Sequence, residues 1–184
     1  MPFIEAHMHA DSRSGEEFER LASAGCRGVL AVSGASGGFG SAAGLADYFR
    51  RLDVLDRQRI ERAGIRAWLA LGIHPAGMPE ADLEQALAAL PALLQARQAQ
   101  AVGEVGLEQG GEAEERVLVR CLQVAADLDL PLLLHTPRRN KRAMLQRSLD
   151  LLAASPLAAE RVLADHLDEG CMERAAQAGS WLGL

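Results

Sequence analysis

The stretch Phe3-Ile4-Glu5-Ala6-His7-Met8-His9, close to the start of the 184-residue chain, decides the fold. It predicts a β-strand, in which successive side chains point to opposite faces of a sheet. Strict alternation gives one wholly apolar face, suited to packing under helices, formed by Ile4, Ala6 and Met8. The opposite face carries Phe3, Glu5, His7 and His9. Two imidazoles on one face at a strand end can reach one metal ion from the same side, so this strand predicts part of a metal site.

The rest of the chain alternates short apolar strands with helical segments. We predict further strands at residues 28–33, 65–73, 101–107, 130–136, 161–166 and 181–184. The helices between them are predicted at residues 14–25, 41–63, 82–94, 112–128, 140–154 and 169–178. Ser14-Gly15-Glu16-Glu17 matches the capping box that starts a helix, and Pro91 should kink or divide the helix that contains it. Residues 34–40, rich in glycine and serine, predict a loop.

Strands that are apolar on both faces and alternate with helices are typical of a parallel sheet covered by helices. Seven such strands predict an α/β fold, a TIM-type (β/α) barrel truncated after the seventh strand, as a single domain over residues 1–184. A doubly wound open sheet is the rival fold. It gives no reason for polar, metal-type side chains at so many strand ends.

The composition narrows the class of protein. The net charge of −6 argues against a protein that mainly coats nucleic acid, and the 4% aromatic content argues against base-stacking platforms. The three widely spaced cysteines predict buried thiols rather than a disulfide framework or a zinc ribbon. Without a signal peptide or an apolar run of membrane-spanning length, we expect a cytoplasmic protein with no membrane partner and no obligate protein partner.

Metal-ligating side chains recur where the predicted strands end, which is where barrel active sites lie. They are His7, His9, His74, Glu104, His135 and His166. One histidine near a strand end is more often a hydrogen-bonded core or loop residue than a ligand, but all five histidines of this chain share that position. Imidazole and carboxylate ligands suit Zn²⁺ or Mn²⁺ rather than Ca²⁺. We expect Glu104 to bridge two ions and a water between them to become nucleophilic.

These motifs resemble those of the TatD-related metal-dependent hydrolases, the TatD DNase family within the amidohydrolase-like superfamily. The matching segments are Glu5-Ala6-His7-Met8-His9 with Asp11-Ser12-Arg13, Gly72-Ile73-His74-Pro75, Gly103-Glu104-Val105-Gly106-Leu107, His135-Thr136-Pro137-Arg138 with Asn140-Lys141, and Asp165-His166. They span the chain in the family's order, which makes the match specific although each segment alone is weak. The resemblance implies a TIM-barrel metallohydrolase, with members that cleave phosphodiesters as DNases.

The resemblance also implies roles for individual residues. His7 and His9 would bind one divalent ion (Zn, Mn or Mg), His135 and His166 would bind a second, and Glu104 would bridge them and help to activate water. The remaining matched residues are assigned to substrate contact or to support of the ligands; they are Glu5, Asp11, Arg13, His74, Arg138, Lys141 and Asp165. The basic run after residue 137 is placed to hold a phosphate, although a solvated helix start explains it equally well.

The chain departs from the family pattern in two places. Glu5 stands where the family usually has aspartate, and we expect it to remain an acceptor in the barrel interior. The family's final strand supplies a metal-binding aspartate, whereas this sequence ends at Leu184 before an eighth strand. We therefore expect a fragment, with a naturally shortened protein as the alternative. Either would leave unpaired strand edges at residues 3–9 and 181–184.

Three functions fit these observations. The first is phosphodiester hydrolysis on a small-molecule or nucleic-acid substrate, favoured by the ligand set and the basic run. The second is hydrolysis of an amide or lactone by the same site, because an activated water attacks either centre. The third is a truncated, non-catalytic barrel that only binds metal, suggested by the absent final carboxylate.

Overall fold

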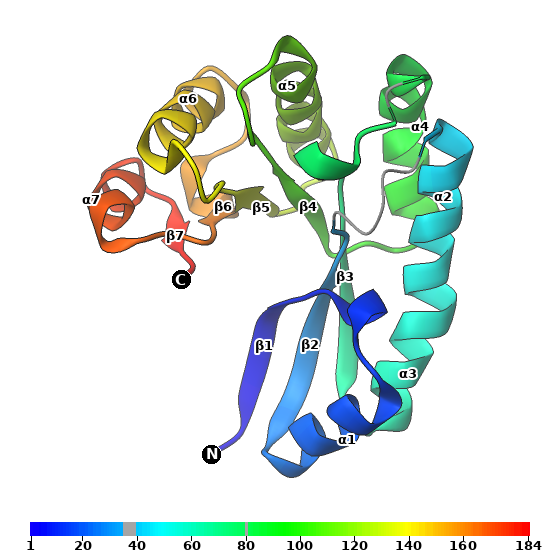
Figure 1. Ribbon diagram of the computed structural model, residues 1–184. Helices are drawn as coiled ribbons and strands as arrows, with labels where there is room; N and C mark the ends of the chain where they lie inside the picture. Colours follow the sequence, from blue (N-terminus) through cyan, green and yellow to red (C-terminus); the bar gives the residue numbers. More distant parts are fainter. Residues whose placement is uncertain (35–39, 80) are drawn as a thin grey trace.

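The computed structural model describes residues 1–34, 40–79 and 81–184, so most of the predicted glycine- and serine-rich loop lies outside the described residues. Seven strands form one parallel sheet in the order β1 to β7. They are β1 (Phe3–Met8), β2 (Cys26–Val32), β3 (Arg66–Leu71), β4 (Ala101–Gly106), β5 (Leu132–His135), β6 (Val162–Ala164) and β7 (Trp181–Leu182). The predicted barrel architecture is confirmed as a curled sheet that stays open between β1 and β7 (Figure 1).

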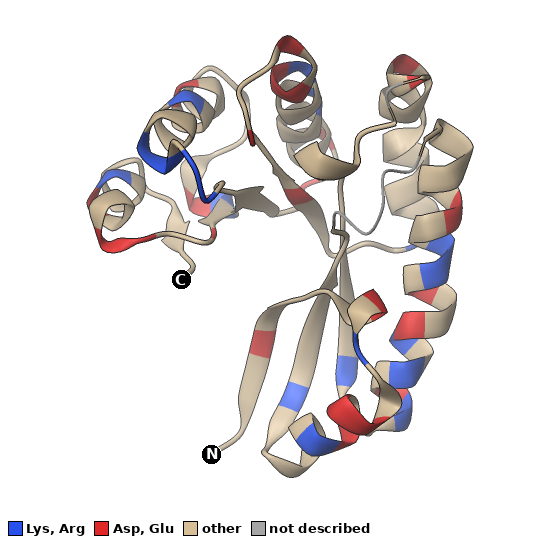
Figure 2. Cartoon of the chain, viewed as in Figure 1, with Lys and Arg blue, Asp and Glu red and all other residues tan. Residues whose placement is uncertain are grey.

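Helices follow the strands and cover the outer side of the curled sheet (Figure 1). They are α1 (Gly15–Ser23), α2 (Ala42–Arg51), α3 (Arg57–Arg62), α4 (Leu83–Ala96), α5 (Glu112–Asp127), α6 (Lys141–Ala153) and α7 (Glu169–Gln177). Figure 2 shows that most charged residues lie on these helices, which face solvent. Among the described helices, none has both the length and the apolar character that a membrane crossing requires.

Two apolar layers hold the sheet in place. The larger lies between the sheet and the helices and contains alternate strand residues such as Val29 and Leu134. The smaller consists of Val32, Ala70, Ala101 and Leu133, which alternate with residues of the first layer and so point to the barrel interior. This smaller layer lies below the strand ends, where the polar side chains gather.

The sequence signals for helices are largely reproduced. Ser14 caps α1, and its hydroxyl and the Glu17 carboxylate exchange hydrogen bonds with the opposite backbone N–H groups, as the capping box predicts. The helix predicted over residues 41–63 is α2 and α3 joined by the π-helical segment η2 (Leu52–Asp56). Asp82 precedes α4 as expected, but its carboxylate accepts a hydrogen bond from the Ala42 N–H at the start of α2.

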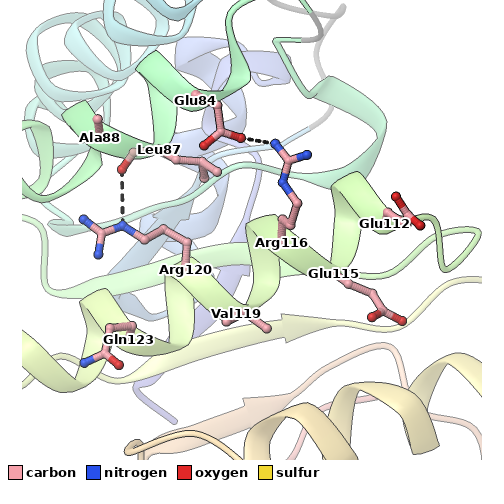
Figure 3. Close-up of a pocket in the computed structure, with 9 residues that line it drawn as sticks. All are labelled: Glu84, Leu87, Ala88, Glu112, Glu115, Arg116, Val119, Arg120 and Gln123. Carbon is pink, nitrogen blue, oxygen red and sulfur yellow. Dashed lines mark hydrogen bonds and ion pairs between the residues drawn. The ribbon is translucent and has the colours of Figure 1, made fainter.

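Of the two outcomes predicted for Pro91, a kink or a division of the helix, the division does not occur, because α4 runs unbroken from Leu83 to Ala96. Proline has no N–H, so the carbonyl of Leu87, four residues earlier, loses its partner within the helix. The Arg120 side chain of α5 replaces that partner, since its Nε donates to the Leu87 oxygen at 3.4 Å (Figure 3). The neighbouring helix thus supplies the hydrogen bond that Pro91 removes.

The prediction that Glu5 shares a face with His7 is also wrong. The pairing of β1 with β2 shifts register between Glu5 and Met8, which breaks strict alternation. Glu5 pairs with Val29, a residue of the layer under the helices, and paired residues of neighbouring strands point the same way. Glu5 lies in a depression beside α1 with Arg13, so its carboxylate faces the helices rather than the barrel interior.

The two open strand edges carry exposed apolar side chains. Ile4 is 60% exposed and Trp181 is 69% exposed, and Leu182 beside it is exposed as well. The predicted burial of Ile4 and Ala6 under helices is therefore wrong, because the register of β1 places Glu5 on the helix side and its neighbour Ile4 on the opposite face. Unpaired strand edges with apolar side chains are sites at which chains associate.

We predict that charged residues on both edges reduce self-association of the chain. In the double variant Ile4→Lys/Leu182→Lys, light scattering at a given protein concentration should fall while the circular dichroism spectrum stays unchanged. Val54→Lys is the matched control, because Val54 is 42% exposed on η2, away from both edges. An equal fall in scattering for Val54→Lys would contradict the assignment of association to the strand edges.

Candidate metal centre

All five histidines converge on one glutamate at the carboxyl ends of the strands. Neighbouring rings lie 4.6 to 5.6 Å apart between centroids. We call this group the histidine cluster; its members are His7, His9, His74, Glu104, His135 and His166. Parallel strands bring these residues together because their carboxyl ends lie at the same end of the barrel.

Glu104 reaches the barrel interior because β4 is irregular. Val102 pairs with Leu132 and Val105 pairs with Leu134, so three steps along β4 match two steps along β5. Regular alternation would place Glu104 on the same face as Val102, under the helices, and the extra residue turns it to the other face. The Glu104 side chain is 1% exposed and lies among the histidine rings.

The two oxygens of Glu104 face different pairs of histidines. Oε2 lies 3.4 Å from His7 Nε2 and 3.5 Å from His9 Nε2. Oε1 lies 2.7 Å from His135 Nδ1 and 3.1 Å from His166 Nε2. One carboxylate therefore lies between two nitrogen pairs that come from opposite parts of the sheet.

Oxygen atoms next to His7 and His9, the pair that faces Oε2, determine which nitrogen of each ring points to Glu104. The Nδ1 of His9 lies 3.2 Å from the carbonyl oxygen of Val32, which can only accept, so Nδ1 carries the proton. The Nδ1 of His7 lies 2.5 Å from Asp165 Oδ2 and donates in the same way. Both Nε2 atoms then point inward, and a carboxylate or carbonyl behind a histidine is the usual support of a metal ligand.

The first pair and Glu104 have the spacing that a divalent ion requires. The two Nε2 atoms are 3.3 Å apart, so with Oε2 they form a triangle with sides of 3.3, 3.4 and 3.5 Å. Ligands bonded tetrahedrally at about 2.0–2.1 Å lie about 3.3–3.4 Å from one another. Oε2 is also buried without a hydrogen-bond partner among the described residues. The donors therefore fit a divalent metal ion.

The charges in the cluster shift several pKa values. Burial raises the pKa of Glu104, but hydrogen bonds from His135 and His166 and the nearby His7 ring outweigh it and hold the pKa well below its usual range. Burial lowers the pKa of His7, but the hydrogen bond to Asp165 and the nearby Glu104 carboxylate outweigh it and raise the pKa to about 9. Burial also raises the pKa of Asp165, and the hydrogen bond from His7 reverses this shift and lowers it. At neutral pH Glu104 and Asp165 are therefore ionised, and the His7 ring is protonated on both nitrogens and positively charged.

His74 lies in the cluster with a different orientation. Its Nδ1 accepts a hydrogen bond from the Ala76 N–H at 3.0 Å, and its Nε2 lies 3.9 Å from Glu104 Oε2. Burial lowers the pKa of His74 to about 4, so the ring is neutral at pH 7 and carries its proton on Nε2. A protonated nitrogen cannot bind a metal, so this arrangement agrees with the supporting or substrate-contact role predicted for His74.

Three of the predicted supporting residues lie near the cluster. Asp165 contacts His7 directly and also accepts a hydrogen bond from the His166 N–H at 2.8 Å. His166 has a positive φ of 57°, and its carbonyl oxygen accepts hydrogen bonds from Lys141 Nζ and from the Thr136 hydroxyl. Arg138 is exposed after β5, at the rim of the cluster. Lys141 therefore holds the His166 backbone, whereas Arg138 is open to solvent.

Asp11 and Arg13 contact helices of the outer layer, and Glu5 faces the same layer. The Tyr48 hydroxyl donates to Asp11 at 2.9 Å. The Arg13 guanidinium pairs with Glu17 of α1 at 3.1 Å. The structure therefore does not bring Arg13 or Glu5 to the cluster, and Asp11, which lies in the segment that follows β1, contacts Tyr48 of α2.

Sequence reasoning missed Glu108, which lies 3.0 Å from His135 Nε2. Burial lowers the pKa of His135, but Glu104 and Glu108 together reverse this shift and raise it. The buried carboxylate of Glu114 accepts hydrogen bonds from three successive backbone N–H groups, including that of Glu108 at 2.9 Å, and so fixes the loop. The sequence could have identified Glu108, because this carboxylate directly follows the predicted strand at residues 101–107.

A groove with a volume of about 840 Å³ lies between α4 and α5. Figure 3 shows Glu84 of α4 paired with Arg116 of α5 across it, and Val119 beside them. Because both helices belong to the outer layer, this groove is separate from the histidine cluster.

Comparisons with known proteins agree with this geometry. The sequence profile of the family described as TatD related DNase matches residues 4–161. The chain belongs to this family. The TatD family chain is 31% identical over 166 residues to an uncharacterized metal-dependent hydrolase, MJ0761, of Methanocaldococcus jannaschii, with 90% of this chain and 66% of the relative covered. It is 32% identical over 162 residues to the uncharacterized metal-dependent hydrolase YjjV of Escherichia coli K12, with 81% of this chain and 56% of the relative covered. The chain thus spans less than two thirds of the length of either relative.

Solved structures show the same fold. A TatD-like protein from Archaeoglobus fulgidus superposes with a TM-score of 0.91 at 28% identity, over 99% of this chain and 76% of the other. The phosphotriesterase homology protein from Escherichia coli, solved with phosphate in its active site, superposes with a TM-score of 0.69 at 18% identity, over 98% of this chain and 69% of the other. The second likeness concerns the fold alone.

We predict that this TatD family chain releases protons when it binds a divalent ion at neutral pH. A metal ligand must be neutral, and His7, with a pKa of about 9, is protonated below that pH. Apparent affinity should therefore rise by up to about tenfold per pH unit from pH 7 to pH 9 and level off above that. Calorimetric titration in buffers of different ionisation enthalpy measures the protons released.

Asp165→Asn is the matched variant for this experiment, because it keeps the size of the side chain and removes the charge that raises the pKa of His7. It should release fewer protons per ion bound at pH 7.5 than the unmodified chain. Equal release by the two proteins, or affinity that does not change between pH 7 and pH 9, would contradict the role given to His7.

Proposed function

We propose that this chain is a divalent-metal-dependent hydrolase that cleaves phosphodiesters, with single-stranded DNA as its substrate class. The observation that supports it most is the position of the buried Glu104 carboxylate, each oxygen of which faces its own pair of histidine nitrogens. In this proposal His7 and His9 hold one ion, His135 and His166 hold a second, and Glu104 bridges them. The imidazole-rich donor set favours Zn²⁺ or Mn²⁺ over Mg²⁺.

When bound, such ions polarise a phosphoryl oxygen and make a water molecule acidic enough to act as a nucleophile at neutral pH. The other tasks belong to side chains of the chain itself. Asp165 and the Val32 carbonyl orient His7 and His9, so that both Nε2 atoms face the same point. Glu108 beside His135 is a proton acceptor at the open side of the cluster, where its side chain is 37% exposed.

The basic segment after β5 is the proposed phosphate contact. It comprises Arg138, Arg139, Lys141 and Arg142, and Figure 2 shows it in blue at the N-terminal end of α6. A helix N-terminus and arginine side chains both favour a phosphate group. This segment follows His135 directly, so a phosphodiester held by it lies beside the cluster, and this favours a phosphodiester over an amide or a lactone.

Replacement of Glu104 by glutamine tests the proposal. With Zn²⁺, Mn²⁺ or Mg²⁺, the unmodified chain should hydrolyse a nitrophenyl phosphodiester and single-stranded DNA. Glu104→Gln should lower kcat/KM by about two orders of magnitude or more, because the bridging charge is lost. The matched control is Glu112→Gln, an exposed carboxylate at the start of α5, which should keep full activity.

Parallel assays on an amide and a lactone separate the alternatives. Metal-dependent cleavage of these substrates without cleavage of either diester would replace the proposed phosphodiesterase by a carbonyl hydrolase. Metal binding without cleavage of any of the four substrates would leave the chain a metal-binding barrel without this activity.

The contribution of Arg138 can be measured as the salt dependence of DNA binding. Fluorescence anisotropy on a labelled single strand, in the Glu104→Gln background to prevent cleavage, gives the slope of log Kd against log salt concentration. Arg138→Ala should weaken binding and reduce that slope by about 0.7, the value for one phosphate contact on a single strand. Arg20→Ala, on the exposed face of α1, should leave the slope unchanged. Equal slopes for the Arg138 variant and its parent would remove Arg138 from the proposed site.

A further inference from the structure

Ser33 lies directly after β2, is 1% exposed, and was not among the residues that the sequence singled out. Its hydroxyl lies between the ends of two other strands, 2.9 Å from the Gly72 carbonyl oxygen after β3 and 3.0 Å from the Gly103 carbonyl oxygen in β4. The Gly72 N–H donates to the same hydroxyl at 2.8 Å. One buried serine thus joins three neighbouring strands below the histidine cluster.

The contacts of Ser33 enclose the peptide group that precedes Glu104. The hydroxyl reaches the carbonyl oxygen of this peptide, on Gly103, and the Glu104 N–H donates to the Ser33 carbonyl oxygen at 3.3 Å. Both polar groups of the Gly103–Glu104 peptide are therefore bound by a single residue. No other residue among those described has this relation to the Glu104 backbone.

This support is needed because the sheet does not supply it. The pairing of β4 with β3 covers Ala101 and Val102, and the pairing with β5 is interrupted between Val102 and Val105. Glu104 lies within that interruption, where the extra residue that turns it inward also removes it from the ladder. Ser33 provides the hydrogen bonds that a regular strand neighbour would have provided.

The backbone beside the Ser33 hydroxyl is closely packed. A Cβ atom on Gly72 would lie 2.7 Å from the Gly103 Cα, closer than such atoms approach. The serine hydroxyl has one hydrogen and two carbonyl oxygens within reach, so it donates to one at a time while it accepts from the Gly72 N–H. Removal of this hydroxyl would leave buried backbone groups without a partner, which favours movement of the β4 backbone.

We infer that Ser33 is a positioning residue that sets where the Glu104 carboxylate lies relative to the Nε2 atoms of His7 and His9. This inference rests on the proposed function, since it takes Glu104 to be a metal ligand. The triangle of 3.3, 3.4 and 3.5 Å between these three atoms depends on the Glu104 backbone, and Ser33 holds that backbone on both sides of its peptide group.

The test compares metal affinity with stability in Ser33→Ala. Competition of Zn²⁺ and Mn²⁺ with a chromophoric chelator gives affinity and stoichiometry, and thermal unfolding of the metal-free protein gives stability. Ser33→Ala should bind metal about 10–100-fold more weakly, the usual effect of removing a group that orients a ligand. Ser33→Thr, which retains a hydroxyl, should restore affinity to within about threefold of the unmodified chain.

Ser148→Ala is the matched control, because Ser148 is also 1% exposed but belongs to α6 in the outer layer. It should leave metal affinity unchanged even if the melting temperature falls. If Ser33→Ala lowers the melting temperature and binds metal as tightly as the unmodified chain, Ser33 is structural only and the inference is overturned. The same holds if Ser148→Ala loses as much affinity as Ser33→Ala.

Two further outcomes are decisive. If Ser33→Ala does not fold, Ser33→Cys takes its place, because a thiol of similar size is a weaker hydrogen-bond donor; undiminished affinity in Ser33→Cys overturns the inference. If the unmodified chain itself binds neither ion, the proposed function fails, and the role of Ser33 fails with it. Loss of affinity in Ser33→Ala or Ser33→Cys, with affinity kept in Ser33→Thr and Ser148→Ala, supports the inference.

Discussion

The site depends on one buried carboxylate among imidazoles. A carboxylate that is 1% exposed loses its hydration, and an ionised group in that position is retained only where partners compensate for the loss. Glu104 has such partners: Oε1 is bound by His135 on β5 and His166 after β6, and Oε2 lies 3.4 Å from His7 of β1 and 3.5 Å from His9. Their hydrogen bonds outweigh the effect of burial on its pKa, so the group stays charged. The curled sheet brings those imidazoles to one point.

A curled parallel sheet achieves this convergence of imidazoles with few residues. Each strand contributes its last residues to the same end of the barrel, so residues as distant as His7 and His166 come within contact of Glu104. The interior layer of Val32, Ala70, Ala101 and Leu133 closes the space below. The open side between β1 and β7 leaves this geometry intact, because Glu104 is on the central strand β4 and the histidines are on both sides of it.

Patterns predicted the fold and the members of the histidine cluster, because periodicity and residue type at strand ends do not depend on fine geometry. The errors arise where register matters. Glu5 was placed inside the barrel by strict alternation, and a single register shift in β1 moves it to the helix side. Glu104 was expected inside, yet the same rule would have turned it outward; only the extra residue in β4 brings it in. A register shift is a property of two paired strands, so one strand's sequence does not reveal it.

Contacts between side chains of different elements could not be predicted from local sequence patterns either. The effect of Pro91 depends on Arg120, which lies on another helix and donates to the carbonyl that the proline leaves free. Glu108 owes its place beside His135 to the three N–H groups that Glu114 holds. In both cases a local rule identifies the group that lacks or offers a hydrogen bond, the Leu87 carbonyl before Pro91 and the Glu108 carboxylate after its strand. The partner came from a residue that only the folded chain brings near.

The carboxylates and imidazoles of the cluster also balance one another's charge. Glu104, Glu108 and Asp165 place three carboxylates within reach of the histidines, and like charges so close repel one another unless positive charge lies between them. The raised pKa of His7, about 9, provides that charge as a bound proton. Protons and a divalent ion are therefore alternative occupants of one preformed set of donors. The backbone that carries Glu104 into this set of donors is hydrogen-bonded to Ser33 on both sides of the Gly103–Glu104 peptide.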